Sequence, residues 1–466
     1  MSTVKLTPDS GGGSVQLKAP ASTSGADVIL KLPNTDGNNN QLLKTDGSGN
    51  LSWADDTDTT NTNASNLTSG TLPDARFPAT LPAVSGANLT GISTAAAGRN
   101  VLLNGDMMIA QDANEDSLAS QTPSGSANEY LYIDRWMSKQ SNGGAFTITQ
   151  STDVPADQGF VYSMKWDCTT ANTVMSSNER IRLTQNLESQ QLHRFLKGSS
   201  NAKVMALSFW IKSNLTGIIT CQLIDEDNAG RTISKTVTIN SANTWEKKTC
   251  LFAGDTTNAP FDKNNGWGLQ VLFHFKAGAN YTDGTYTDNT WAALVSGNQV
   301  HSSNINLASS TSNELYITGI QLEPESVTDY EFMDMGLQLA KCQRYYHVIN
   351  QKGGNTVSKS VTSAVAAYSS TEAYATFQHP VPMRSDPSVI ATNGTSNWQC
   401  CGSFGGSAGC DNFPNIVISP NDPQGNNATN CWLGPNAQLA ITAGNSYWVR
   451  TSDSDASLAF RADPGN

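Results

Sequence analysis

The chain has 466 residues, which is long enough for two or three domains with cores of their own. Its formal net charge of −12 repels nucleic-acid phosphates and anionic lipid headgroups, so we expect neither nucleic acid nor a membrane as a partner. No apolar run approaches the ~20 residues of a membrane helix. The first residues lack the apolar core of a signal peptide, so we expect synthesis in a cytoplasm.

Residues 1–98 contain few large apolar side chains, and some of these recur at a regular spacing. A leucine followed by a lysine returns every 13 residues, each time beside a turn signal, at Leu17, Leu30 and Leu43. One copy of such a segment cannot bury a core, whereas three copies wound around one axis can. We therefore expect a β segment at 1–60 and a shaft at 61–98, both of which fold stably only within a homotrimer. The alternative is a flexible linker.

Residues 99–333 show strand-sized runs separated by polar turns, with almost no helical periodicity. Residues 206–212 alternate apolar and polar side chains, as a half-buried strand does. Further strands are expected at 132–136, 244–252, 266–275 and 313–322. This spacing predicts a β-sandwich, whose core we expect to contain Trp136, Trp210 and Trp245.

A helical pattern follows the sandwich. One apolar stripe runs along it, made of Met335, Leu339, Cys342 and Tyr346. The stripe predicts a short linking helix and strand at 334–350. A stripe this narrow fits packing around a threefold axis or docking onto the sandwich.

Residues 351–466 are expected to form a second β-sandwich at the tip of the molecule. Flat rings flanked by amides suit the recognition of sugars, and four aromatic side chains lie among Asn and Gln here. The candidate receptor-binding residues are Trp398, Trp432, Tyr447 and Trp448. Two of them have loop-like surroundings, where binding residues concentrate, namely Trp398 and Trp432. The alternative for each ring is a place in a small core or in a trimer interface.

The sequence offers little for catalysis. The histidines are scattered and no G-x-S-x-G elbow is present. We expect the acidic run 225–227 to be a solvated turn, and Glu323 and Glu325 to cap or contact a neighbouring segment. We therefore expect no enzymatic activity and no cofactor.

Eight cysteines occur without a C-x-x-C pair, so we expect buried thiols. A metal site or a late disulfide are the alternatives for Cys400, Cys401, Cys410 and Cys431. Calcium could be bound by loop oxygens of the sandwich, but a plain turn is the expectation for Asp283, Asp288 and Asn289.

Several segments resemble bacteriophage tail fibres. Residues 32–53 and 71–92 are similar to fibre segments of short-tailed marine and other phages. Residues 317–332 and 339–348 resemble the region that turns a shaft into a receptor-binding head, and 374–390 resembles a strand pair of C-terminal heads. Residues 99–333 resemble the jelly-roll, carbohydrate-binding-module-like domain of such fibres, but depart from it in an acidic insert from Asp112 to Asp116.

The resemblance implies a mainly β, elongated trimeric fibre with an N-terminal shaft, a jelly-roll β-sandwich, a short helix and a C-terminal β-sandwich tip. It implies a virion protein, assembled in the host cytoplasm and held through its N-terminus by phage tail, adaptor or nozzle proteins. The tip at 351–466 would bind a host surface glycan or outer-membrane receptor. The alternatives are a tailspike-like glycan depolymerase and a purely structural virion spacer or head fibre.

Overall fold

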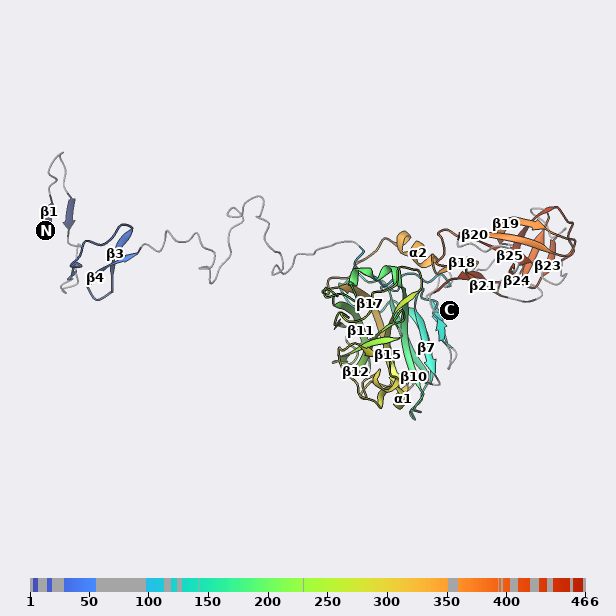
Figure 1. Cartoon of the computed structure of the whole chain (residues 1–466), viewed down its shortest axis with the longest axis horizontal. Helices are drawn as coiled ribbons and strands as arrows, with labels where there is room; N and C mark the ends of the chain where they lie inside the picture. The colour runs from blue at the N-terminus through green and yellow to red at the C-terminus, as the bar shows by residue number, and fades with distance from the viewer. Residues whose placement is uncertain are drawn as a thin grey trace. The chain divides into compact units, whose positions relative to one another are not determined.

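The computed structural model describes a mainly β protein, as the sequence predicts (Figure 1). The chain divides into two compact units, residues 1–92 and 93–466. Within the described residues, no helix is long and apolar enough to cross a membrane. The described residues are 3–6, 15–18, 29–55, 98–112, 119–123, 128–141, 143–228, 230–350, 359–392, 394, 397–402, 410–419, 427–433, 439–452 and 456–463.

The first unit contains two antiparallel hairpins. Strand β1 (Thr3–Leu6) pairs with β2 (Val15–Lys18), and β3 (Gln41–Thr45) pairs with β4 (Leu51–Asp55). The second hairpin turns at Asp46, whose carboxylate accepts the backbone N–H groups of residues 48 and 50 at 2.7 and 3.1 Å. Such a side-chain acceptor fixes the turn that the Asp-Gly pair predicts.

Five large apolar side chains among the described residues of this unit lie on its surface. The exposed fractions range from 43% to 74% for Ile29, Leu30, Leu32, Leu42 and Leu43. The indole of Trp53 is an exception, because it packs on Gly37 and donates to the carbonyl of Thr35 at 2.7 Å. Except for Gly98, the predicted shaft at 61–98 lies outside the described residues, so the threefold shaft stays a prediction.

Two sheets of the second unit pack face to face as a β-sandwich. The seven-stranded sheet has the order β16-β13-β12-β15-β10-β7-β6, and the six-stranded sheet the order β14-β11-β17-β9-β8-β5. The first comprises β6 (Asn128–Tyr130), β7 (Met137–Ser141), β10 (Arg180–Glu188), β12 (Gly217–Asp225), β13 (Arg231–Ile239), β15 (Trp267–Ala277) and β16 (Ala292–Ala293). The second comprises β5 (Ser120–Gln121), β8 (Ala145–Ser151), β9 (Ser163–Thr170), β11 (Met205–Ser213), β14 (Glu246–Phe252) and β17 (Glu314–Pro324).

Alternation along the central strands places one row of apolar side chains between the sheets. Phe209 of β11 and Phe273 of β15 meet there edge to face, with ring centroids 5.0 Å apart. The strands predicted at 206–212, 244–252, 266–275 and 313–322 are confirmed as β11, β14, β15 and β17. The segment 132–136 instead forms the turn before β7.

The prediction for the three sandwich tryptophans is right for one ring and wrong for two. Trp136 is fully buried in the core and donates its indole N–H to the carbonyl of Asn104 at 2.9 Å. Trp210 and Trp245 are half-buried and lie outside the main core. The indole of Trp245 instead donates to the carboxylate of Asp153 at 3.0 Å.

Short helical turns connect the sandwich strands: η5 (Ser189–Gln191), η6 (His193–Phe195), α1 (Ala279–Thr282), η7 (Ser296–Asn298) and η8 (Leu307–Ser309). The predicted linking helix is α2 (Met335–Gln343). Asp334 is its N-cap residue, and the carboxylate of Asp334 accepts the backbone N–H of Leu337 at 3.1 Å. Its buried side chains are Gln338 and Cys342.

Helix α2 docks onto the sandwich through a polar contact. Gln338 donates to the carboxylate of Asp106 at 2.6 Å, while Met335 is 58% exposed. The predicted stripe is therefore wrong at Met335, and Tyr346 belongs to the strand that follows the helix. Docking is confirmed as one of the two predicted uses of this helix.

The tip consists of two sheets around a second core. A three-stranded sheet has the order β18-β27-β21, and a seven-stranded sheet the order β23-β22-β26-β19-β20-β25-β24. The strands are β18 (Tyr346–Asn350), β19 (Ser360–Ala367), β20 (Ala373–Gln378), β21 (Ser388–Ala391), β22 (Trp398–Cys401), β23 (Cys410–Phe413), β24 (Ile416–Ile418), β25 (Ala428–Leu433), β26 (Ser446–Thr451) and β27 (Leu458–Arg461).

Candidate functional site

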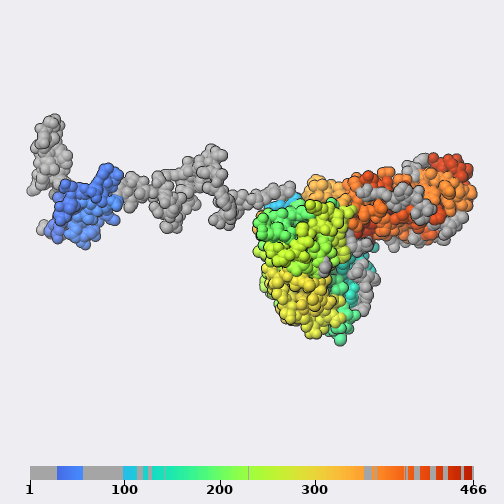
Figure 2. Space-filling view, in the orientation of Figure 1, coloured from blue at the N-terminus to red at the C-terminus, as the bar shows by residue number. Residues whose placement is uncertain are grey.

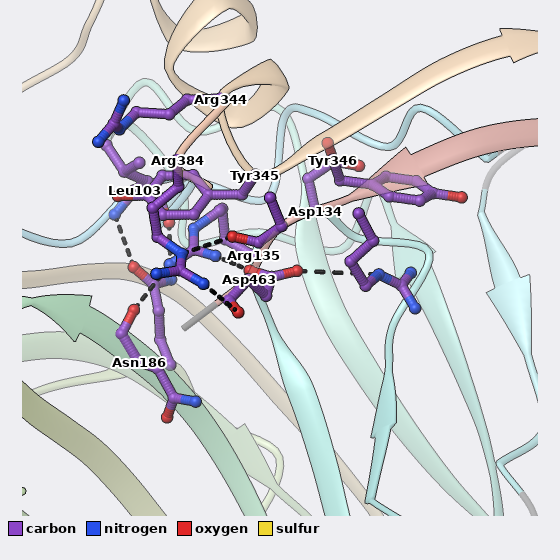
Figure 3. A network of polar contacts seen from close by, with 12 residues as sticks. Leu103, Asp134, Arg135, Asn186, Arg344, Tyr345, Tyr346, Arg384 and Asp463 are labelled. Atoms are coloured by element: carbon purple, nitrogen blue, oxygen red, sulfur yellow. Dashed lines mark hydrogen bonds and ion pairs between the residues drawn. The ribbon is translucent and has the colours of Figure 1, made fainter. Parts of the chain in front are cut away.

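A buried polar network joins the sandwich to the tip within the second unit (Figure 3). Figure 2 shows the outer surfaces of the sandwich and of the tip. The guanidinium of Arg135 forms an ion pair with Asp463, and both side chains are at most 4% exposed. Arg135 also donates to the carbonyl of Asn186 at 2.7 Å and lies 3.6 Å from the ring centroid of Tyr345. The end of the chain is thereby tied to two sandwich segments.

A second arginine extends this network from the end of α2. Arg344 makes two hydrogen bonds of 2.9 Å to the carboxylate of Glu188 on β10. The same carboxylate accepts the phenol of Tyr345 at 2.5 Å. Because these bonds favour the charged form, the pKa of Glu188 stays below its usual value despite its burial.

A third arginine closes the junction from the tip. Arg384 donates to the backbone carbonyls of Ala462 at 2.6 Å and Asp463 at 3.1 Å, and to that of Asn265 in the sandwich at 3.0 Å. Bonds from charged donors are stronger than neutral ones, so we expect the tip and the sandwich to move as one body.

Beside this network lies a cleft of about 350 Å³. Its walls come from the first residues of the sandwich, from the edge strand β6, and from β18, β21 and β27 of the tip. The lining residues are Asp112, Gln121, Glu129, Tyr130, Tyr132, Tyr346, Asn350, Ile390, Ser457, Ala459 and Arg461. The cleft therefore exists because the tip is docked on the sandwich.

One arginine organises the aromatic wall of the cleft. The guanidinium of Arg461 lies 4.3 Å from the ring centroid of Tyr130 and 4.6 Å from that of Tyr346. The phenol of Tyr346 donates to the carboxylate of Asp112. Tyr132, in contrast, is 37% exposed at the rim of the cleft.

Burial raises the pKa of acidic and phenolic groups in the cleft. Desolvation raises the pKa of Asp112, although the bond from Tyr346 and the charge of Arg461 oppose this rise. Desolvation also raises the pKa of Tyr130 and of Tyr346. Both phenols therefore stay neutral, and Tyr346 donates its one proton to Asp112.

The cleft combines groups that suit the binding of a small polar ring. Tyrosines offer an apolar face and a polar hydroxyl, while Arg461, Glu129 and Gln121 supply charged and amide groups. None of these residues was predicted as a site. Tyr130 and Tyr132 are two apart in the sequence, but their partners on β18 and β27 lie more than two hundred residues further along the chain.

The tip residues that the sequence singles out occupy three different environments. Trp398 is fully buried in the tip core and donates its indole N–H to the carbonyl of Thr392 at 2.9 Å. Trp448 is 7% exposed. Tyr447 is half-buried, packs against the core, and accepts the N–H of Thr442 at 2.8 Å. The interpretation of the surroundings of Trp398 as a loop is wrong, because it opens β22.

Trp432 lies on β25, so the prediction that its surroundings form a loop is also wrong. Its ring stacks on Tyr374 of β20, with centroids 6.5 Å apart and planes inclined by 14°. Tyr374 meets the ring of Tyr368, which is 71% exposed, edge to face. A row of three rings thus crosses one face of the tip sheet, and the role of Trp432 as a receptor-binding residue stays a prediction.

The acidic residues of the sandwich differ in part from the environments that the sequence predicts. Asp225 is not solvated, because it is fully buried and forms a 2.7 Å ion pair with Lys197. Glu323 is buried and accepts the N–H of Thr328 at 2.7 Å, which confirms it as a capping acid.

A disulfide joins Cys401 to Cys410, while Cys400 and Cys431 are buried thiols. Within the described part of the chain, no group of three His, Cys, Asp or Glu side chains is placed to hold a metal ion.

No protein-family model and no curated protein matches this chain. Among solved structures, the enzymatically active domain of tailspike protein 4 from bacteriophage CBA120 matches with 13% identity and a TM-score of 0.25. That match covers 48% of the present chain but 21% of the tailspike.

Carbohydrate-binding modules match as well. A family 11 module from Clostridium thermocellum, solved with a mixed-linked tetrasaccharide, has 11% identity, a TM-score of 0.22, and coverage of 46% of this chain and 99% of its own. A family 61 module, solved with β-1,4-galactotriose, has 10% identity, a TM-score of 0.22, and coverage of 49% and 99%. At such identities and TM-scores, the likeness says nothing of what this chain binds.

Proposed function

We propose that this chain is a bacteriophage tail fibre that attaches the virion to the host surface by binding a glycan, without catalysing its breakdown. The observation that carries the proposal is the cleft beside Arg461, where three tyrosines and several polar side chains converge. Shallow clefts with aromatic walls and a few directed polar groups are typical of sites that bind polar rings. The sequence resemblance of 317–348 to fibre heads supports the virion setting.

The cleft suits attachment because the groups that form it are held in place. Arg461 is fixed between two rings, and the tip strands beside it are anchored by the ion pair of Arg135 with Asp463. A site that is organised before the ligand arrives avoids the entropic cost of ordering side chains on binding.

We further propose that the fibre is a homotrimer held by tail or nozzle proteins through its N-terminus. The five exposed leucine and isoleucine side chains of the first unit support association between copies, because an interface would cover apolar groups that a single chain leaves in water. Three identical sites in one fibre would increase the avidity for a repeating surface polymer. Sedimentation of the full chain at micromolar concentration should give three times the mass of 49.6 kDa. A stable monomer would argue against this assembly.

The direct test of the proposed function is binding of the purified full chain to an array of bacterial surface polysaccharides. We expect retention on at least one polysaccharide, and competition by the soluble form of that polymer. Release of reducing ends from the bound polymer would favour a depolymerase instead. A chain that binds no polysaccharide and does not block phage adsorption would favour a structural spacer.

A further inference from the structure

Three cationic side chains gather on the outer face of the seven-stranded sandwich sheet. Lys139 of β7 lies directly opposite Arg182 of β10 in the strand register, and Arg182 in turn lies opposite His274 of β15. Arg180 stands two residues before Arg182 on the same strand. Paired positions of neighbouring strands have their Cβ atoms within about 5.5 Å of each other, so the register holds like charges side by side.

The pleat of β10 sets the direction of these side chains. Ile181 and Leu183 belong to the sandwich core, so Arg180 and Arg182 project from the opposite face of the sheet. Arg182 is 5% exposed, whereas Lys139 and Arg180 are half-buried. On this outer face the cluster therefore runs from a buried side chain, Arg182, to two side chains that reach solvent.

Other buried cations in the sandwich have a carboxylate partner. Lys276 pairs with Glu179 at 2.9 Å, and Lys197 pairs with Asp225 at 2.7 Å. Within the described residues, none of the three clustered cations forms an ion pair, and the Nε of Arg182 has no hydrogen-bond partner.

Burial and mutual repulsion both act on this cluster. Desolvation, followed by the charge of Arg180, lowers the pKa of Arg182 to about 9. Desolvation, followed by the charge of Arg182, lowers the pKa of Lys139 to about 8, while Glu226 opposes this shift without forming an ion pair. A buried charge without a partner lowers the stability of the fold. An anion bound at this cluster would neutralise that charge and remove the cost.

The surroundings of the cluster contain further groups suited to a polar ligand. The ring of Trp267 lies 5.3 Å from the ammonium of Lys139, and the ring of Tyr281 lies 4.5 Å from the guanidinium of Arg180. Buried polar atoms without a hydrogen-bond partner also occur here, namely Thr184 Oγ1, His274 Nδ1 and Trp267 Nε1. A bare inorganic anion would use the charges but not the rings.

We propose that Lys139, Arg180 and Arg182 bind the carboxylate of an acidic saccharide on this face of the sandwich. The carboxylate approaches from the half-exposed side of Lys139 and Arg180, and it accepts two hydrogen bonds from the planar guanidinium of Arg182. The sugar ring lies toward the ring of Trp267, which is 5.3 Å from the ammonium of Lys139. This site is separate from the cleft beside Arg461 and does not rest on the function proposed for that cleft.

The test compares three probes on the full chain: a β-1,4-linked oligoglucuronate, the cello-oligosaccharide of the same length, and sodium sulfate. Calorimetric titration should show binding of the oligoglucuronate at least about tenfold tighter than that of the other two. Arg182→Gln should lower the affinity for oligoglucuronate at least about tenfold. The control Lys203→Gln makes the same change of charge at a surface pair with Glu325 and should leave the affinity unchanged. Equal binding of the neutral sugar or of sulfate would overturn the proposal.

The same unpaired charge should affect the stability of the chain without any ligand. Because the buried Nε of Arg182 has no hydrogen-bond partner and no ion pair among the described residues includes Arg182, Arg182→Met should raise the melting temperature of the ligand-free chain. A lower melting temperature would mean that Arg182 has a partner inside the protein, and the site would not exist. In wild type, oligoglucuronate should raise the melting temperature more than sulfate does.

Discussion

At the scale of single residues, the ion pair of Arg135 with Asp463 shows how the end of the chain is held. Both side chains are buried, so the removal of one charge leaves the other without compensation. We expect Asp463→Asn to lower the free energy of unfolding by about 3–5 kcal/mol. Urea denaturation followed by circular dichroism measures this loss. The double variant Arg135→Met with Asp463→Leu should recover much of it, and a double variant as unstable as the single one would contradict the explanation.

Two histidines of the tip make its stability depend on pH. The Nδ1 atoms of His347 and His379 lie 3.1 Å apart, and His379 also contacts Thr429 Oγ1 at 2.9 Å and the ring of Phe460. Desolvation lowers the pKa of both imidazoles to about 4, with the charge of His379 also lowering that of His347.

The unfolded chain takes up protons near the usual histidine pKa of about 6.5, whereas the folded chain does so near 4. The unfolded state therefore binds more protons within this window, and stability should fall as the pH decreases from about 6.5 to 4. Melting temperatures measured across the window test this. The variant His379→Gln should show a flatter profile, and an unchanged profile would assign the pH dependence to other groups.

At the scale of elements, α2 presents two different surfaces. Gln338 is buried against Asp106, whereas Leu337 is 52% exposed in the described chain. Gln338→Ala should cost about 1–3 kcal/mol, because a buried carboxyl loses its hydrogen-bond donor. Leu337→Ala should change the stability of a single chain by less than about 0.5 kcal/mol.

Chemical denaturation of the two helix variants, together with sedimentation, separates docking from assembly. A large loss of trimer on Leu337→Ala would show that the exposed face of α2 packs around the threefold axis. An equal effect of both substitutions on a monomeric sample would contradict the observed docking of the helix.

At the scale of the whole molecule, the sequence predicts what depends on local patterning. Alternation along 206–212 is sufficient to predict β11, because a half-buried strand alternates its side chains between the core and the outer face. The strand-sized run at 266–275 predicts β15, which is buried along nearly its whole length. The helix at 335–343 followed from its own spacing. In contrast, Gln338 was not predicted to be buried, since its partner Asp106 belongs to the opening of the sandwich.

The candidate cleft could not be predicted, because it forms where distant segments meet. Tyr130, Tyr346 and Arg461 carry no shared motif, and their proximity follows from the docking of the tip on the sandwich. Sequence reasoning favoured aromatic rings within the tip instead, and it could not tell the buried Trp398 from the half-buried Trp432. The register of the strands decides whether a ring is buried in a small core. A loop-rich composition does not reveal that register.

The measurement that tests the cleft most directly is the affinity of point variants for the polysaccharide that the wild-type chain retains. Tyr132→Ala removes a ring at the rim of the cleft, and Tyr368→Ala removes an exposed ring from the row on the tip sheet. Both variants should keep the wild-type melting temperature. We predict that Tyr132→Ala weakens binding at least about tenfold and that Tyr368→Ala changes it less than about twofold. The opposite result, or equal affinity for both variants and wild type, would contradict attachment through the cleft.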